Sequence, residues 1–155
     1  MAHFAELKSM TDPTGFTSDT HQVVQREVVV GNDIAAGGGT LEENDMHVDG
    51  ETWCANFFKG GSWKQTSYNH NFRKQYCGKG FTFDAAKNKF ISPQPFASWA
   101  LDGNDDWQAP VTYPTDTTDK TIRWDEAGQK WTATDNSDPV NNFNWDASAL
   151  AWVSA

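Results

Sequence analysis

The chain has few of the aliphatic residues that usually fill a protein core. Hydrophobic residues make up 37% of its 155 residues, and no apolar run approaches the roughly 20 residues of a membrane span. Aromatic residues make up 14%, including eight tryptophans. Because a large aromatic side chain buries about 150–250 Å², we expect a core of few, large side chains. Such a core favours small twisted sheets over long helices.

Cysteines and the common catalytic motifs are also scarce. Cys54 and Cys77 do not make a disulfide framework. Their apolar or aromatic neighbours indicate buried free thiols, and a single bond between the two is the alternative. The sequence has no Gly-x-Ser-x-Gly elbow, no phosphate-binding loop and no His-Glu-x-x-His helix. The four histidines show no metal-ligand spacing with the cysteines. We therefore expect no catalytic activity, no cofactor and no metal.

Two acidic stretches resemble parts of a calcium loop. Asp45 to Gly50 has glycine at the sixth place, but Asn56 stands at the twelfth, where a bidentate Glu is expected. The second stretch alternates in the same way but has tryptophan at its sixth place: Asp102, Asn104, Asp106, Trp107. We interpret both as polar turns. Calcium at the first, and a weakly bound cation at the second, remain the alternatives.

Basic residues are outnumbered, with 12 Lys and Arg against 21 Asp and Glu and a net charge of −9. A net acidic chain argues against nucleic acid as a partner. Seven of the bases lie within residues 59–89 with only one acid, Asp84. This basic island consists of Lys59, Lys64, Arg73, Lys74, Lys79, Lys87 and Lys89. It predicts either a charge-complementary contact surface or a solvated face neutralised by its acidic flanks.

A short aromatic–acid pattern occurs three times in the second half of the chain. In each copy an aromatic residue precedes Asp, and a second aromatic follows seven positions after the first. The copies are Phe83-Asp84 with Phe90, Trp124-Asp125 with Trp131, and Trp145-Asp146 with Trp152. Alternation on both sides of a small or polar loop predicts three β-hairpins, with the Asp accepting backbone N–H groups across the turn. We expect the aromatic pairs to bury each other across the strands.

These patterns predict an α+β fold that is mainly β, with short antiparallel hairpins and one short helix. We expect strands at 3–7, 22–30, 63–68 and 71–76, loops at 9–20, 32–49 and 92–116, and a helix at 51–59 between Asp49 and Gly60. Asp135 to Asn142 is polar and contains a proline, which is typical of a hinge. We therefore expect a β-rich core domain at 1–134 and a C-terminal hairpin extension at 135–155.

Five stretches carry a family resemblance: 2–5, 28–32, 60–69, 71–76 with Gly78 and Gly80, and 90–96 with Ser98 and Trp99. Together they resemble small virion structural proteins of marine tailed phages, especially phages of cyanobacteria, over most of residues 2–133. The most specific parts are Trp63 to Asn69 and Pro93 to Trp99. The long 9–20 loop and the third hairpin depart from the pattern of that group. The resemblance implies a part of a virion without fixing which part, and it implies no catalytic residues.

We therefore expect a virion accessory protein, made in the host bacterial cytoplasm because residues 1–6 lack the basic and apolar regions of a secretory signal. The leading placement is a capsid decoration protein that binds the assembled shell. The alternatives are a neck, tail or fibre-associated subunit with glycan-binding ability, and a free carbohydrate-binding module. The expected partners are the major capsid protein or tail subunits, further copies of the chain and a host-surface glycan, with neither nucleic acid nor membrane.

The candidate partner contacts come from three regions of the chain. Bases of the island would meet an acidic surface. Two tryptophans in the proline-rich segment are expected to be exposed, for protein packing or sugar stacking. The third hairpin lies beyond the resemblance and is the first place to expect a neighbouring subunit. The candidates are Lys64, Arg73, Lys74 and Lys79; Trp99 and Trp107; and Phe143, Trp145 and Trp152.

Overall fold

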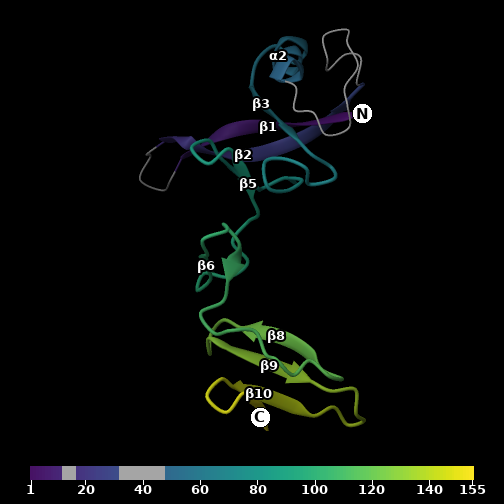
Figure 1. The fold of residues 1–155 in the computed structure, drawn as a ribbon, viewed down its shortest axis with the longest axis vertical. Helices are drawn as coiled ribbons and strands as arrows, with labels where there is room; N and C mark the ends of the chain where they lie inside the picture. Colours follow the sequence, from purple (N-terminus) through teal and green to yellow (C-terminus); the bar gives the residue numbers. More distant parts are fainter. Residues whose placement is uncertain (12–16, 32–47) are drawn as a thin grey trace. The chain divides into compact units, whose positions relative to one another are not determined.

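The computed structural model describes residues 1–11, 17–31 and 48–155, with side chains described at 1–10, 21–31 and 50–155. The chain forms two compact units, Met1–Pro93 and Gln94–Ala155 (Figure 1). The sequence instead suggested a division between residues 134 and 135. The difference arises because the third hairpin pairs with the second in one sheet and belongs to the second unit.

The first unit is a five-stranded antiparallel sheet with one helix among its described residues. The strand order is β3-β1-β2-β4-β5, and α2 packs against β3 and β1 (Figure 1). The elements are β1 (Ala2–Thr11), β2 (Thr17–Val30), α2 (Val48–Phe57), β3 (Ser62–Thr66), β4 (Thr82–Asp84) and β5 (Lys89–Ile91). Together with the second sheet they confirm a mainly β fold with antiparallel hairpins and, in the part of the chain that the structure describes, one short helix.

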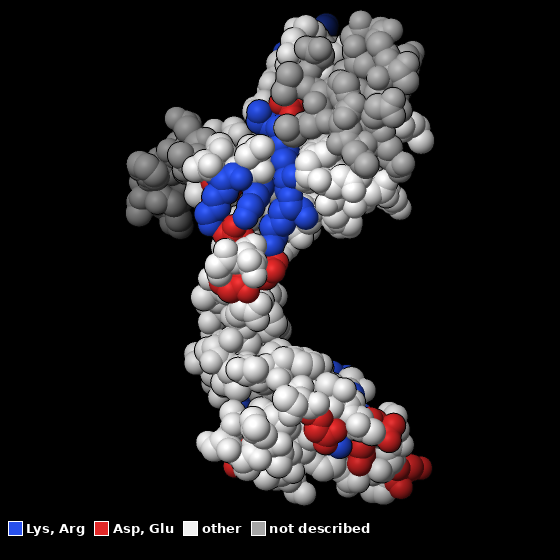
Figure 2. All heavy atoms as spheres, in the orientation of Figure 1, with Lys and Arg blue, Asp and Glu red and all other residues white. Residues whose placement is uncertain are grey.

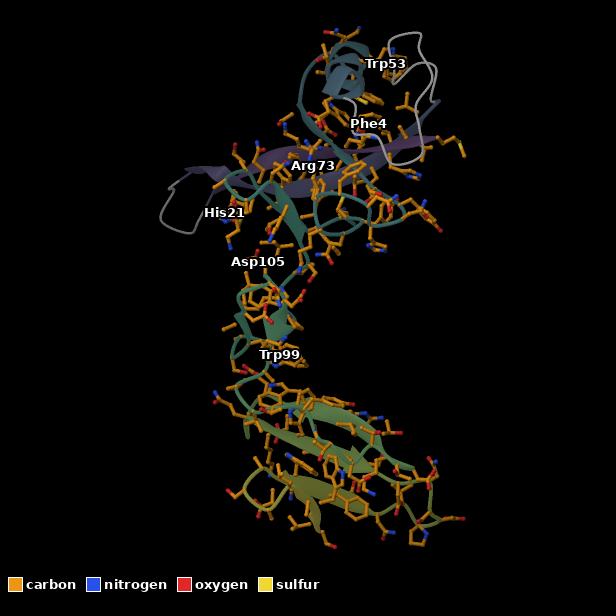
Figure 3. The ribbon with its side chains drawn as sticks, in the orientation of Figure 1. Phe4, His21, Trp53, Arg73, Trp99 and Asp105 are labelled. Atoms are coloured by element: carbon orange, nitrogen blue, oxygen red, sulfur yellow. The ribbon has the colours of Figure 1, made fainter. Side chains whose placement is uncertain are left out.

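The two faces of β1 serve two different cores, as the two-residue period of a strand dictates. Phe4 is fully buried with Cys54 and Trp63 beneath α2 (Figure 3). On the other face, Ala5 and Leu7 join a second cluster, which also contains Val24, Cys77, Phe83 and Phe90. Aromatic rings supply the bulk of both clusters, as the low aliphatic content predicts.

The second unit contains a four-stranded antiparallel sheet and a small hairpin. The sheet has the order β11-β10-β9-β8, and its core contains Trp124, Trp131 and Trp145. The elements are β6 (Ala100–Leu101), β7 (Trp107–Gln108), β8 (Thr121–Asp125), β9 (Lys130–Thr134), β10 (Asn142–Asp146) and β11 (Ala151–Ser154). Apart from β6 and β7, residues 92–116 have no strand, as expected.

The three aromatic–Asp copies do form three similar hairpins. Their aromatic pairs lie directly opposite each other: Phe83 and Phe90, Trp124 and Trp131, Trp145 and Trp152. The ring centroids are 5.0, 5.0 and 5.1 Å apart, with interplanar angles of 55°, 67° and 62°. In the first and third copies the Asp carboxylate accepts a backbone N–H from the turn, at 3.1 Å from Lys87 and 3.0 Å from Ala149.

Several expected elements differ from the structure. Residues 71–76 are not a strand, because Arg73 and Lys74 adopt positive φ angles of 54° and 73°, which break an extended backbone. Residues 9–11 and 17–20 are strand rather than loop, since a register shift after Ser9 lets β1 and β2 keep pairing. The helix spans 48–57 rather than 51–59. The expected loop at 32–47, with the start of the calcium-like stretch, lies outside the described residues.

Candidate functional site

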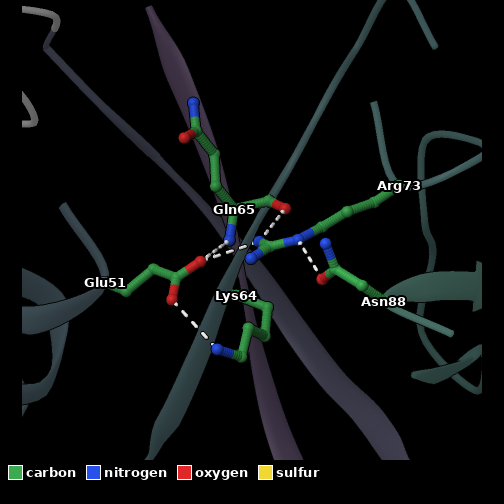
Figure 4. Close-up of polar contacts among 5 residues, drawn as sticks. All are labelled: Glu51, Lys64, Gln65, Arg73 and Asn88. Carbon is green, nitrogen blue, oxygen red and sulfur yellow. Dashed lines mark hydrogen bonds and ion pairs between the residues drawn. The ribbon is translucent and has the colours of Figure 1, made fainter. Parts of the chain in front are cut away.

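Two bases of the island converge on one carboxylate inside the first unit (Figure 4). Arg73 Nη1 lies 2.7 Å from Glu51 Oε1, and its side chain is only 4% exposed. Lys64 Nζ lies 3.2 Å from Glu51 Oε2, with its side chain 33% exposed. Arg73 Nε also donates to Asn88 Oδ1 at 3.0 Å. Arg73 therefore has a structural role rather than a place on an outer surface, and Lys64 is partly neutralised.

Arg73 forms hydrogen bonds with both edge strands of the five-stranded sheet. On β3, the Gln65 N–H donates to Glu51 Oε1 at 2.9 Å, and the Gln65 carbonyl accepts from Arg73 at 2.8 Å. On β5, the Phe90 N–H donates to the Arg73 carbonyl at 3.0 Å, and the Phe90 carbonyl accepts from Gln75 at 3.0 Å. Since these edge groups are already hydrogen-bonded within the first unit, they are not open to another chain.

The rest of the island lies nearer the surface. Lys79 is exposed, as are Lys59 and Lys87, while Lys74 is half-buried. Figure 2 shows Lys and Arg side chains gathered on one face of the first unit. The first unit as a whole has nine bases against eleven acids, and the second unit has three bases against ten acids. Most of the net negative charge thus lies on the second unit, whereas Lys and Arg gather on one face of the first.

Trp99 is packed into the core of the second unit instead of standing exposed (Figure 3). Its ring centroid lies 5.5 Å from that of Phe96, 5.9 Å from Trp131 and 6.3 Å from Trp124. Its indole Nε1 is buried and has no hydrogen-bond partner among the described residues. Trp107 is half-buried in β7. The expected pair of exposed stacking tryptophans is therefore not present.

A carboxylate holds the 96–99 segment against the sheet. Glu126 accepts from the Ser98 N–H at 2.8 Å, from the Ser98 hydroxyl at 2.7 Å and from Trp124 Nε1 at 2.7 Å. The hydrogen bond that the Ser98 side chain donates lowers the pKa of Glu126 most, and the one from Trp124 lowers it further. This anchor explains why a proline-rich segment covers the tryptophan core.

The aromatic residues of the third hairpin also make internal contacts. Trp145 is buried, and Trp152 Nε1 donates to the Asp116 carbonyl at 2.8 Å. Lys120 Nζ lies 4.9 Å from the centroid of the Phe143 ring. The exposed large apolar side chains of this hairpin are Leu150 and Val153, which are 63% and 46% exposed. Sequence reasoning missed both residues, although strand alternation from Trp152 places Val153 on the opposite face of the sheet.

Two hollows open on the second unit. One of about 290 Å³ is lined by residues 110–113 with Trp145, Ala147 and Leu150, and Tyr113 there is 53% exposed. The other, of about 530 Å³, is polar and includes Asp116, Asp119 and Asp135. The Asn141 side chain and backbone N–H both donate to the Asp135 carboxylate and lower its pKa.

The cysteines are free and buried, as expected. Cys77 Sγ donates to Glu27 Oε1 at 3.3 Å, and the Tyr76 hydroxyl donates to Glu27 Oε2 at 2.8 Å. Burial, together with the Glu27 hydrogen bond, raises the pKa of Cys77 to about 12. Burial first and Glu51 second raise the pKa of Cys54 to about 11. Both sulfurs are therefore poor nucleophiles near neutral pH.

The stretch at 102–106 forms a polar turn. Asp102 Oδ1 accepts the N–H groups of Asn104 and Asp106 at 2.8 and 3.0 Å, and its Oδ2 accepts from Gln108 at 3.1 Å. Among the side chains that the structure describes, no three His, Cys, Asp or Glu residues gather as metal ligands would. No helix in the described ranges is long and apolar enough to cross a membrane.

Comparisons with known proteins give no relatives for this arrangement. No protein-family model, curated protein or solved structure matches the chain.

Proposed function

We propose that the protein is a structural accessory subunit of a tailed-phage virion, present in many copies. Its leading placement is a decoration protein bound to the assembled capsid shell. The proposal is supported by the resemblance over residues 2–133 and by a fold whose conspicuous side chains build cores and cap sheet edges. Within the described residues, Arg73, Trp99 and the hairpin aromatics all serve such internal packing.

The single observation that carries the proposal is the basic face of the first unit, in a chain whose second unit is strongly acidic. Exposed bases such as Lys59 and Lys79 lie on the first unit, whereas the second unit has three bases against ten acids. A basic face and an acidic unit in one small subunit suit attachment to complementary patches of a repeating lattice. Such contacts are exposed to solvent, so salt screens them and weakens attachment.

Mass spectrometry of purified particles of the encoding phage tests the proposal. We expect the protein in intact particles, and particles without it would overturn the proposal. Copy number then separates the placements. Hundreds of copies indicate the shell, whereas about three, six or twelve indicate the neck, tail or fibres, following the usual closed symmetries.

A binding assay tests the role of the basic surface. Particles lacking the protein are mixed with the purified chain and sedimented at increasing salt. The double variant Lys59→Glu, Lys79→Glu should bind more weakly than the wild type because it reverses two exposed charges of the island. The double variant Lys120→Glu, Lys130→Glu is the control, since it also reverses two charges but in the second unit. Equal loss in both variants would contradict a role for the basic face.

The tail or fibre placement has one observation in its favour. The hollow of about 290 Å³ presents Tyr113, which is 53% exposed and has a ring on which a sugar could stack. If this hollow binds a host glycan, a glycan array should give signals that Tyr113→Ala abolishes. An array without signals would remove the glycan from the proposal and leave the shell placement intact.

A further inference from the structure

The outer strands of the two larger sheets differ in how well they are protected from pairing with another chain. Side chains and the 73–75 segment cap β3 and β5 at Gln65 and Phe90. The outer strand β8 carries Arg123 and Asp125, and charged residues discourage pairing with another chain. The remaining outer strand, β11, reads Ala-Trp-Val-Ser and has neither a charge nor a proline. It lacks the sequence devices that usually protect an exposed edge.

The register of the third hairpin shows which backbone groups face outward from β11. The Ala155 N–H donates to the Asn142 carbonyl at 2.9 Å. Residues of an antiparallel strand alternate in the side to which their backbone groups point. Ala151 and Val153 therefore face β10, and the N–H and C=O groups of Trp152 and Ser154 face away from it. Within the described residues, the structure pairs β11 with β10 alone.

The side chain of Val153 lies on the open face of the sheet. Val153 is directly opposite Asn144, which is directly opposite Thr132, so all three share one face. Trp152 is on the other face, where its indole binds the Asp116 carbonyl. Val153 is 46% exposed and is the large apolar side chain that β11 places on this face. A partner strand along β11 would cover it.

We propose that β11 pairs antiparallel with β11 of a second copy of the chain, about a two-fold axis that passes beside Val153. Trp152 then lies opposite the partner's Ser154, and each such pair exchanges two backbone hydrogen bonds through the outward-facing groups. Val153 lies opposite the partner's Val153 in the closer, non-bonded type of pair. The two four-stranded sheets become one continuous sheet.

A second copy is the occupant that this strand suits best. Pairing about a two-fold axis places identical residues opposite each other, and β11 has no charge that would then repel itself. The same self-pairing by β8 would bring its charged side chains beside their own copies. The contact is short, so we expect a weak dimer in solution that is favoured when copies are held close together. This inference does not depend on attachment to a virion.

Sedimentation of the purified full chain over a range of concentrations tests the pairing. We expect the wild type to shift from monomer to dimer as concentration rises. Val153→Lys and Val153→Glu should each stay monomeric, because like charges then meet at the axis. An equal mixture of the two variants should regain the dimer through opposite charges. Thr132→Glu is the control, since it adds a charge to the same face away from the outer strand and should dimerise like the wild type.

Other outcomes overturn the proposal. The proposal is wrong if the wild type stays monomeric at millimolar concentration. It is also wrong if the Val153→Lys variant dimerises like the wild type. Ser154→Pro provides an independent check, because it removes an outward N–H that the ladder to β10 does not use. It should be folded by circular dichroism and monomeric. These measurements use only the purified chain, so their failure is distinct from absence of the protein from virions.

Discussion

Arg73 and Glu51 are 22 residues apart in the sequence, and their Nη1 and Oε1 atoms lie 2.7 Å apart in the first unit. The same carboxylate oxygen accepts the Gln65 N–H, and Arg73 donates to the Gln65 carbonyl. An ion pair thus supplies the donor and the acceptor that a neighbouring strand would offer to β3. Two side chains therefore close the sheet edge at that point. Arg73, which belongs to the basic island in the sequence, is used inside the first unit and not on a contact surface.

Replacing Arg73 should therefore destabilise the first unit strongly. Arg73→Met leaves the nearly buried Glu51 charge without its main partner and the Gln65 carbonyl without its donor. We expect the free energy of unfolding to fall by about 3–5 kcal/mol, as is usual when one member of a buried pair is removed. Urea denaturation followed by circular dichroism measures the loss.

Lys64→Met is the matched control for that experiment, because it removes the other partner of the same carboxylate. Lys64 is one-third exposed, so water already screens its contact, and we expect a loss of at most about 1 kcal/mol. Similar losses in the two variants would contradict the view that Arg73 closes the sheet edge.

The hairpins could be predicted from the sequence because their signals are local. An aromatic, an Asp, a short loop and a second aromatic all lie within eight residues, and the backbone period places the rings together. The 71–76 segment could not be predicted in the same way. Its irregular path depends on positive φ angles at Arg73 and Lys74, and arginine and lysine give no sequence signal for that conformation.

Partners distant in the sequence explain the other differences. Trp99 lies among prolines, which suggested that its side chain is exposed. Instead it packs against the tryptophans of β8 and β9, and Glu126 holds its segment there through Ser98. Likewise, the island was counted as surface charge because nothing near Arg73 in the sequence shows that α2 provides Glu51. Charge and hydropathy patterns identify the residues that stand out in the sequence. Whether such a residue is exposed depends on its contacts with residues that are distant in the sequence.

A glycine in α2 lies so close to Phe4 that it has no room for a side chain. A Cβ at Gly50 would lie 2.2 Å from Phe4 Cζ, well inside van der Waals contact. Gly→Ala usually stabilises a helix interior by about 1 kcal/mol. Here we expect Gly50→Ala to destabilise the first unit, because overpacking a core costs about 1–3 kcal/mol.

Thermal melting of Gly50→Ala beside Thr52→Ala checks this expectation. Thr52 is an exposed position of the same helix, so its replacement should be neutral or slightly stabilising. A stabilising Gly50→Ala would show that α2 does not pack against Phe4 as described.

The third hairpin contains a residue with a strained backbone, and a substitution there should relieve the strain. Leu150 has a φ of 51° at the last position of its turn, where the first hairpin has Asn88 with the same φ. Leucine is penalised by about 1–2 kcal/mol in the left-handed region, and asparagine less so. Leu150→Asn should raise the free energy of unfolding of the second unit by about 1 kcal/mol. Leu150→Ala removes the exposed side chain but keeps the strain, and should show no such gain in chemical denaturation.

The buried thiols should be unreactive in the folded protein. With pKa values of about 11 for Cys54 and about 12 for Cys77, almost none of either thiol is ionised at pH 8. A chromogenic disulfide reagent should therefore react slowly in buffer and rapidly in denaturant, and Cys54→Ser assigns the two phases. Rapid reaction in buffer would contradict the burial of both sulfurs.

The raised pKa values also mean that folding stability is retained below about pH 8.5 and declines as the pH rises toward 11.

Acid should weaken the second unit through Asp135. Its folded pKa is lowered by the hydrogen bonds from Asn141, so its contribution is present above the usual Asp pKa of about 3.9 and is lost as the pH falls toward the lower folded value. Asp135→Asn should lower the melting temperature at pH 7 and give a shallower decline between about pH 5 and pH 2. Tryptophan fluorescence reports this unit, which contains six of the eight tryptophans. Asp119→Asn, an exposed carboxylate beside the same hollow, should keep the wild-type acid profile, and an equally shallow decline there would argue against a specific role for Asp135.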